Sequence, residues 1–227
     1  MLSMSELMNW LLSPETWAGR YGLWNLLGEH LWLTSLSILI AAIIALPIGI
    51  AIGHFGKGEV LVIGLSSLSR AIPTMGLLFA LVMLAGVEAK SVAVVFALVV
   101  ISIPPLLAGA HSGIRAIPRA ITDAAIAQGM TGSQLLKHVE LPIAAASIIG
   151  GFRVAYIQVI STIVLAPLVG LGGLGFGIIQ GLALRNFAQV TGSGLVIVLL
   201  TVLGDQLIGK LQRVSAVTLG NSTQSRY

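Results

Sequence analysis

Apolar residues lie along this chain in long runs rather than in short periodic blocks. Five mostly apolar stretches are separated by small groups of charged residues, which mark where each stretch ends. A helix needs about 20 such residues to cross the hydrocarbon core of a bilayer. A helix, unlike a lone strand, also satisfies its own backbone hydrogen bonds there. The pattern therefore predicts five transmembrane helices, at residues 31–53, 60–85, 91–110, 142–167 and 193–209.

Composition supports a membrane protein of the all-α class. Of the 227 residues, 56% are hydrophobic and 9% are charged, whereas a soluble domain carries about 25% charged residues. The net charge of +4 comes from 12 Lys and Arg against 8 Asp and Glu, and it does not require a nucleic-acid partner. Cysteine is absent and the four histidines are scattered, so we expect no metal site in this chain.

The positive charges divide unequally between the two sides that five spans imply. One side carries Lys57, Arg115, Arg119, Lys137, Lys210, Arg213 and Arg226, and the other carries Arg20, Lys90 and Arg185. Cytoplasmic segments hold the excess of Lys and Arg in membrane proteins. We therefore expect the amino terminus outside, the carboxyl terminus inside, and the connection at residues 111–141 in the cytoplasm.

The two ends of the chain differ from the apolar runs. Residues 1–30 lack the pattern of a signal peptide, and Ser13-Pro14 suits the start of a helix. Trp17 and Trp24, seven residues apart, predict an extracytoplasmic segment at the membrane interface. The alternatives are an aromatic cage for a cation and a sixth span. Residues 214–227 are expected to form a disordered cytoplasmic tail.

The most informative polar connection is IPRAITDAAIAQGMTGSQLLKHVELP, residues 117–142. Its alanine-rich first half favours a helix, which Gly129 would end in a left-handed conformation. Thr131 or Ser133 can cap a second short helix, and Pro142 is expected to end that helix. A helix–glycine–helix between two spans suits the docking of another protein, and an amphipathic loop resting on the bilayer is the alternative.

This connection resembles the loop motif of permeases from binding-protein-dependent ABC importers, E-A-A-x-x-x-G-x(9)-I-x-L-P. Asp replaces Glu and Val replaces Ile, and every spacing agrees at Asp123, Ala124, Ala125, Gly129, Val139, Leu141 and Pro142. The resemblance implies a type I permease fold, similar to that of the methionine importer, with about five core helices over residues 31–213. It also implies that these seven residues form the coupling loop that contacts a cytoplasmic ATPase.

Three further passages, at residues 70–78, 150–161 and 168–182, resemble the osmoprotectant branch of that family. The branch imports glycine betaine, choline or carnitine, and a methionine-type amino-acid importer is the alternative because it shares the glycine-rich element. The resemblance implies a bacterial cytoplasmic membrane, cytoplasmic ATPase subunits that bind ATP and Mg, and an extracytoplasmic substrate-binding protein. It further implies a second permease copy, identical or paralogous. No cofactor is expected on this chain.

Candidate residues for a gate or translocation path lie in two places. Pro73 removes a backbone hydrogen bond inside the second predicted span, close to Arg70. The glycines of VGLGGLGFG match G-x-G-x-x-G, but a dinucleotide site needs a strand before this motif and a helix after it. We therefore predict a flexible turn that leads into a segment dipping toward the pore mouth, a plain tight loop being the alternative. The glycines concerned are Gly170, Gly172, Gly173 and Gly175.

Charged residues inside the spans suggest one structural contact. Arg153 is expected to pair with Asp205, because a charge at that depth needs a partner. A cationic ring that includes Arg70 is the alternative. The spans offer no acid at mid-membrane that could bind sodium or relay a proton, which disfavours a secondary transporter, and a simple membrane anchor would not need the glycine-rich element.

No catalytic constellation is present in the sequence. The stretch GDQLIGKL, residues 204–211, imitates a phosphate-binding loop, but Leu211 stands where Ser or Thr must bind magnesium. We therefore expect a transport subunit without an active site of its own, whose ATP is hydrolysed by a partner.

Overall fold

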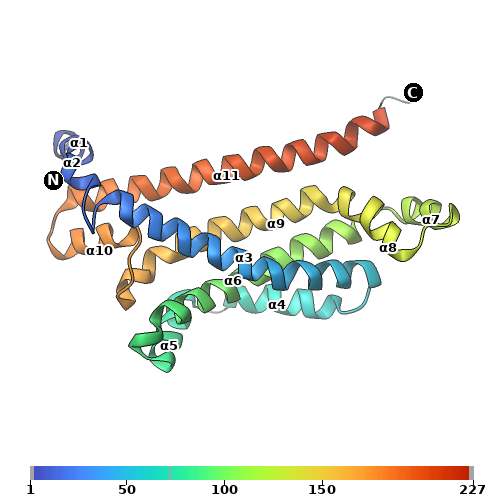
Figure 1. Ribbon diagram of the computed structural model, residues 1–227, viewed down its shortest axis with the longest axis horizontal. Helices are drawn as coiled ribbons and strands as arrows, with labels where there is room; N and C mark the ends of the chain where they lie inside the picture. The colour runs from blue at the N-terminus through green and yellow to red at the C-terminus, as the bar shows by residue number, and fades with distance from the viewer. Residues whose placement is uncertain (1–2, 72, 225–227) are drawn as a thin grey trace. The chain divides into compact units, whose positions relative to one another are not determined.

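The computed structural model describes residues 3–71 and 73–224, with side chains described for 3–67 and 73–216 (Figure 1). Every regular element in those ranges is helical. The chain divides into two compact units, and each of its four long helices contributes to both of them. The first unit comprises Met1–Leu39, Ile72–Ile101 and Tyr156–Gly204, and the second comprises Ile40–Ala71, Ser102–Ala155 and Asp205–Tyr227.

Four helical stretches of the described chain are long and apolar enough to cross a bilayer, at Leu23–Phe55, Val87–Arg115, Gly132–Val169 and Phe187–Ala216. They contain the long helices α3 (Leu23–Phe55), α6 (Lys90–Arg115) and α9 (Leu141–Thr162) and most of α11 (Phe187–Gln224). Helix α11 thus runs through most of residues 214–227, for which the sequence predicts a disordered tail.

The second predicted span, residues 60–85, is made of two shorter helices. Helix α4 (Glu59–Ala71) ends just before the proline, and α5 (Thr74–Ala85) begins just after it. Pro73 caps α5 with φ of −66° and ψ of 109°, an extended conformation that a continuous helix could not contain. The interruption follows from the missing N–H and the bulk of the proline ring.

The amino-terminal segment forms two short helices, α1 (Met4–Leu12) and α2 (Pro14–Trp17), which are too short to cross a bilayer. Ser13 is the N-cap and Pro14 the first residue of α2, as the sequence predicts. The ring of Trp17 contacts that of Trp24 at a centroid distance of 5.0 Å. The next helix, α3, begins at Leu23 rather than near residue 31.

The first unit has two apolar clusters. One joins α5, α6, α9 and the 3₁₀ turn η3 (Ile163–Val169) through buried residues such as Leu78, Leu98 and Ile163. The other surrounds Leu174, which is fully buried against the start of α3 and against α11. Between them the chain turns from η3 into α10 (Gly175–Ala183), which packs on η3. The clusters fix the turn that carries the candidate gate glycines.

Small residues bring the helices of the second unit close together. A Cβ added at Gly109 of α6 would lie 2.8 Å from Cα of Gly151 in α9, and one at Gly49 of α3 would lie 2.7 Å from the carbonyl oxygen of Leu107. Only glycine permits such backbone approach. Close packing of this kind is the usual means of association between helices in lipid. Lipid tails are as apolar as the side chains, so the hydrophobic effect does not drive the helices together there.

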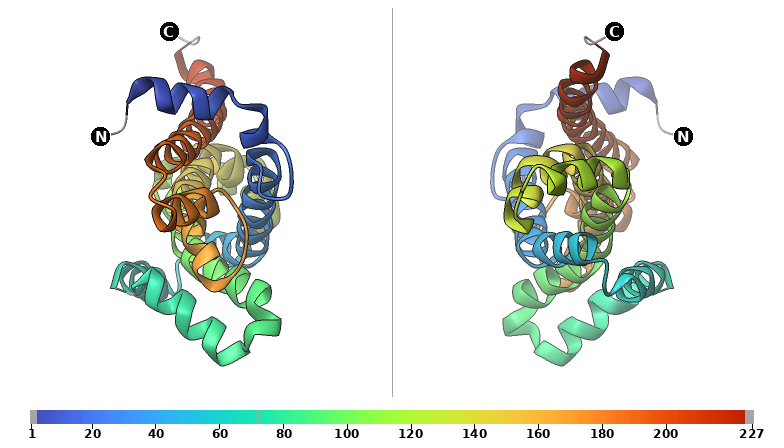
Figure 2. Two further views of the ribbon diagram at one scale, coloured as in Figure 1. Left: turned by 90° about the vertical axis from the view of Figure 1, so that its left-hand side faces the viewer. Right: turned by 90° about the vertical axis from the view of Figure 1, so that its right-hand side faces the viewer.

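The connection between α6 and α9 contains α7 (Arg119–Ala127) and α8 (Gly132–Leu135), and lies at the end of the second unit where α3 and α6 terminate (Figure 2). Gly129 adopts φ of +88°, which confirms the predicted left-handed end of α7. Its neighbour Met130 donates its N–H to the carbonyl of Ala125 at 3.2 Å, which completes a Schellman motif. Thr131, whose side chain accepts from the N–H of Gln134, caps α8.

Pro142 does not end the second helix of this connection, contrary to the prediction. The chain continues from α8 through a π-turn, η2 (Leu136–Glu140), directly into α9. In that turn the N–H of Leu141 donates to the carbonyl of Leu136, five residues back. The wider turn accommodates a proline at the start of α9, because it relieves the carbonyl four residues earlier, which the ring would otherwise obstruct.

Candidate functional site

The glycine-rich turn between η3 and α10, residues 170–175, is held by side chains from two other helices. The ammonium group of Lys90 donates to the carbonyl oxygen of Gly170 at 2.9 Å. The carboxylate of Glu29 accepts from the N–H of Gly173 at 3.0 Å. Gly170 and Gly173 have φ of +78° and +96°, a conformation that only glycine adopts at little cost. We call this segment the glycine turn.

His30 anchors the end of the glycine turn from inside the first unit. Its side chain is fully buried, with Nε2 lying 3.1 Å from the carbonyl oxygen of Ile160 and Nδ1 lying 3.3 Å from the backbone nitrogen of Leu174. A carbonyl only accepts and a backbone N–H only donates, so the ring is neutral with its proton on Nε2. Both ring nitrogens are therefore engaged in positioning the turn.

The sequence pattern did not indicate Glu29, His30 and Lys90 as partners of the turn, because all three lie outside the predicted spans. The only feature that could have indicated these contacts was the pair of adjacent polar residues, Glu29 and His30, at the edge of an apolar run. Helix α3 can begin eight residues earlier than predicted, at Leu23 rather than residue 31, because these polar groups bond the turn instead of ending the helix.

At three glycines after Leu171, atoms of other residues occupy the position that a Cβ would take. A Cβ at Gly172 would overlap the carboxylate of Glu29, one at Gly175 would overlap the carbonyl oxygen of Val164, and one at Gly177 would overlap Oγ of Ser193. The turn follows a 3₁₀ helix, and the described chain contains no strand before it. The G-x-G-x-x-G spacing therefore arises from packing and not from a βαβ nucleotide site.

Substituting Gly175→Ala is expected to destabilise the protein by about 1–3 kcal/mol, because the new Cβ must displace backbone that cannot rotate away. Thermal unfolding of the detergent-solubilised protein measures the effect. The matched control is Gly194→Ala in α11, where a Cβ meets nothing within 4 Å and helix propensity favours alanine. Equal melting temperatures for the two variants would contradict the packing argument.

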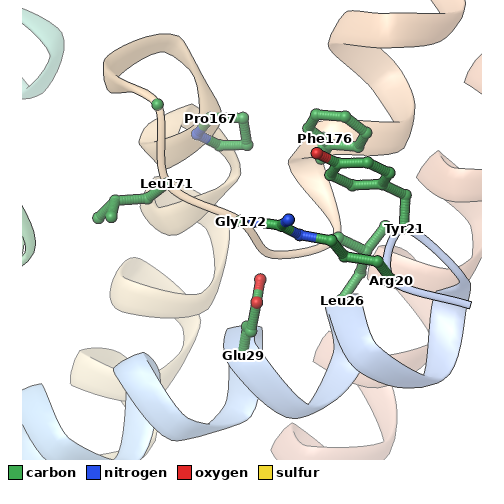
Figure 3. Close-up of a pocket in the computed structure, with 9 residues that line it drawn as sticks. Arg20, Tyr21, Leu26, Glu29, Pro167, Leu171, Gly172 and Phe176 are labelled. Atoms are coloured by element: carbon green, nitrogen blue, oxygen red, sulfur yellow. The ribbon is translucent and has the colours of Figure 1, made fainter.

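A cavity of about 210 Å³ opens beside the glycine turn (Figure 3). Its walls include Glu29 from α3, Gly172 from the turn and Phe176 from α10, together with Arg20 and Tyr21 from the connection between α2 and α3. The rings of Tyr21 and Phe176 stack at a centroid distance of 4.7 Å. Arg20 places its guanidinium carbon 5.7 Å from the centroid of the Tyr21 ring.

The seven residues of the predicted coupling loop are presented in different ways. Asp123, Ala124 and Gly129 are exposed, whereas Ala125 is buried. Val139 lies within the π-turn, and Leu141 and Pro142 begin α9, all three half-buried. The motif thus combines an exposed helix surface with residues that shape the connection to the spanning helix.

A polar pair joins the coupling loop to the end of α3. Nδ1 of His54 lies 2.5 Å from Oε2 of Glu140, which is 5% exposed. The pair borders a cavity of about 430 Å³ that also contacts Asp123 and Arg119 of α7. Nothing in the sequence indicates this contact, because 86 positions separate the two residues. No group of three or more His, Asp or Glu side chains gathers anywhere in the described part of the chain.

Arg153 of α9 and Asp205 of α11 are brought together by the second unit. The guanidinium donates from Nε to Oδ1, and from Nη2 to Oδ2 at 2.7 Å. Two parallel bonds between a planar fork and a carboxylate are the strongest geometry available to such a pair. The side chain of Arg70 lies outside the described residues. Pro73 is exposed at the start of α5, which contacts η3 ahead of the glycine turn.

Comparison with known proteins agrees with this architecture. The glycine betaine/carnitine/choline transport system permease protein OpuCB of Bacillus subtilis is 30% identical over 186 residues, covering 82% of this chain and 85% of that protein. The osmoprotectant import permease protein OsmW of Salmonella typhimurium is 31% identical over 189 residues, covering 82% and 88%. An inward-facing structure of the MetNI methionine ABC transporter matches with a TM-score of 0.75 and 22% identity, over 94% of this chain and 99% of that one.

The family assignment rests on most of the spanning region. Residues 43–215 match the family described as binding-protein-dependent transport system inner membrane component. This range includes the coupling motif, the glycine turn and the Arg153–Asp205 pair. The protein is therefore a multi-pass inner-membrane permease that belongs to the family of binding-protein-dependent transport system inner membrane components, with the type I ABC importer fold.

Proposed function

We propose that this protein is the permease subunit of an ATP-driven importer of osmoprotectants such as glycine betaine, choline or carnitine. The observation that carries the proposal is the match to OpuCB and OsmW across more than four-fifths of the chain. The methionine transporter shares the fold at 22% identity, which does not support a shared substrate.

In this proposal the exposed face of α7 contacts a cytoplasmic ATPase, which binds ATP and Mg and hydrolyses the nucleotide. Ile121 and Ile126 of α7 are 41% and 55% exposed, and Ala124 between them offers no bulk. Apolar side chains beside a small residue suit close approach by a protein partner better than contact with water. The Schellman motif at Gly129 fixes the end of this surface.

The remaining partners and the orientation belong to the same proposal. The Lys and Arg distribution supports an outer amino terminus and an inner carboxyl terminus. A second permease copy, identical or paralogous, completes the pathway, and a substrate-binding protein delivers the solute to the outer face. In the spans of the described chain, Glu29, Glu140 and Asp205 each have a hydrogen-bonding partner, and Glu88 lies at the very start of its span. This pattern disfavours ion-coupled transport by this chain alone.

The glycine turn, together with Pro73 and Arg70, is proposed as a gate element of the translocation path. The turn is pinned by Glu29 and Lys90 through bonds to Gly173 and Gly170, and such bonds can break and re-form as the spans alternate. A double substitution, Gly172→Ala with Gly173→Ala, is expected to lower uptake by about tenfold or more, because one Cβ displaces Glu29 and the other strains a left-handed residue.

Uptake into sealed proteoliposomes measures that effect, with ATPase activity recorded in parallel. Gly194→Ala serves again as the control that adds the same atom without contact. Full uptake by the double variant would remove the gate proposal and leave a plain connecting loop.

The proposed function is tested by co-purification and transport. Tagged permease is expected to retain its ATPase subunit in mild detergent, and the reconstituted assembly with its binding protein is expected to accumulate radiolabelled glycine betaine when ATP is supplied. Uptake without ATP, driven by a sodium or proton gradient, would overturn the importer proposal. Uptake of methionine in place of glycine betaine, choline and carnitine would overturn the substrate class.

A further inference from the structure

We propose that the cavity beside the glycine turn is a binding site on the permease itself for a zwitterionic quaternary amine, a betaine. This inference rests on the proposed function and extends it, because it names one substrate chemistry and the residues that recognise it. Arg20, Tyr21, Glu29 and Phe176 line this one small cavity (Figure 3).

The cavity holds one positive and one negative side chain that do not neutralise each other. Figure 3 shows Glu29 pointing into the cavity from α3 and Arg20 reaching into it from the connection above. Among the side chains that the structure describes, no ion pair joins them, since the recorded pairs are His54–Glu140 and Arg153–Asp205. Opposite charges that share a cavity without pairing suit a ligand that carries both charges.

The rest of the wall fits the cationic end of such a ligand. A quaternary ammonium has no N–H to donate, so it is recognised by carboxylate charge and by aromatic rings. Phe176 stacks on Tyr21, and Arg20 lies over the Tyr21 ring, so an ammonium would meet the remaining ring surface of this pair. Glu29 supplies the charge while one of its oxygens remains bonded to Gly173. The guanidinium of Arg20 offers the planar fork that a carboxylate accepts in two parallel bonds.

Size and charge narrow the ligand further. The volume of about 210 Å³ is below the range of roughly 300–1,000 Å³ that is typical of sites for drug-sized molecules. It therefore favours a solute of few heavy atoms. A cation without a carboxylate, such as choline, would meet the repulsion of Arg20 with nothing to offset it. We therefore expect glycine betaine to bind this site more tightly than choline does.

The test measures solute binding to the full-length permease in lipid nanodiscs, without ATPase or binding protein. Saturation-transfer NMR of the ligand methyl protons gives dissociation constants for glycine betaine and for choline. Glu29→Gln is expected to weaken glycine betaine binding by about tenfold, the size of one lost charge-assisted contact, while its amide oxygen still accepts from Gly173. Arg20→Gln is expected to weaken glycine betaine by about tenfold and to leave choline unchanged or tighter.

The controls are Glu88→Gln and Arg185→Gln, which remove the same charges from exposed positions of the first unit. No binding by the wild type, or equal binding by all variants, would overturn the inference. So would an equal loss of choline and glycine betaine in Arg20→Gln, because a structural effect does not distinguish the two solutes. Uptake of glycine betaine by the assembled transporter, measured separately, decides the proposed function whichever way the binding result falls.

Discussion

Uptake is expected to fall by about tenfold or more when Ala124 is replaced by tryptophan, while the permease itself remains folded. The side chain at position 124 is exposed on α7, so the larger ring meets no other part of this chain. It would instead hold the ATPase away from the helix surface, and overfilling a close contact costs about 1–3 kcal/mol. Solute uptake and co-purification of the ATPase both report the loss.

Ala124→Ser is the matched control, because it keeps the side chain small and is expected to transport normally. The melting temperature of both variants should stay near that of the wild type, which separates lost docking from lost folding. If Ala124→Trp transports at the wild-type rate with its ATPase bound, α7 is not the coupling surface.

Assembly is expected to fail when either member of the Arg153–Asp205 pair reverses its charge, and to return when both are reversed. In Arg153→Asp two carboxylates face each other between α9 and α11, and in Asp205→Arg two guanidinium groups do so. Like charges within a span are poorly tolerated because water does not screen them there. The double variant restores opposite charges at the same positions, so the pair can re-form.

The yield of monodisperse permease from membranes, by size-exclusion chromatography, measures assembly. Lys210→Asp reverses an exposed charge farther along α11 and is expected to keep the yield. A double variant that assembles no better than the single ones would show that each side chain acts independently of the other.

The apolar runs were sufficient to predict an all-α membrane protein, and the family match confirms the fold class. Local chemistry was equally informative at Gly129 and Thr131, because a left-handed helix end and a capping side chain depend on residues close in sequence. The loop motif identified the permease family for a similar reason, since its spacing lies within 20 residues, from Asp123 to Pro142.

Contacts between distant residues account for what the sequence did not predict. Helix α3 begins early because Glu29 and His30 find partners on a turn 144 positions away. The second predicted span divides at Pro73, where the choice between a kink and a break depends on packing. The aromatic and charged groups of the cavity around Glu29 come from three separate segments, so no spacing rule could have joined them.

The π-turn before Pro142 joins the connection between α6 and α9 directly to α9. An i→i+5 turn holds more residues than an α-helical turn. It therefore shifts the directions in which the following side chains point, while the helix continues without a break. The side chains that α8 presents to its neighbours therefore need not lie on the same face of the helix as those that α9 presents to the other spans. If the proposed ATPase displaces the connection, we expect α9 to move together with it, because no loop separates α8 from α9.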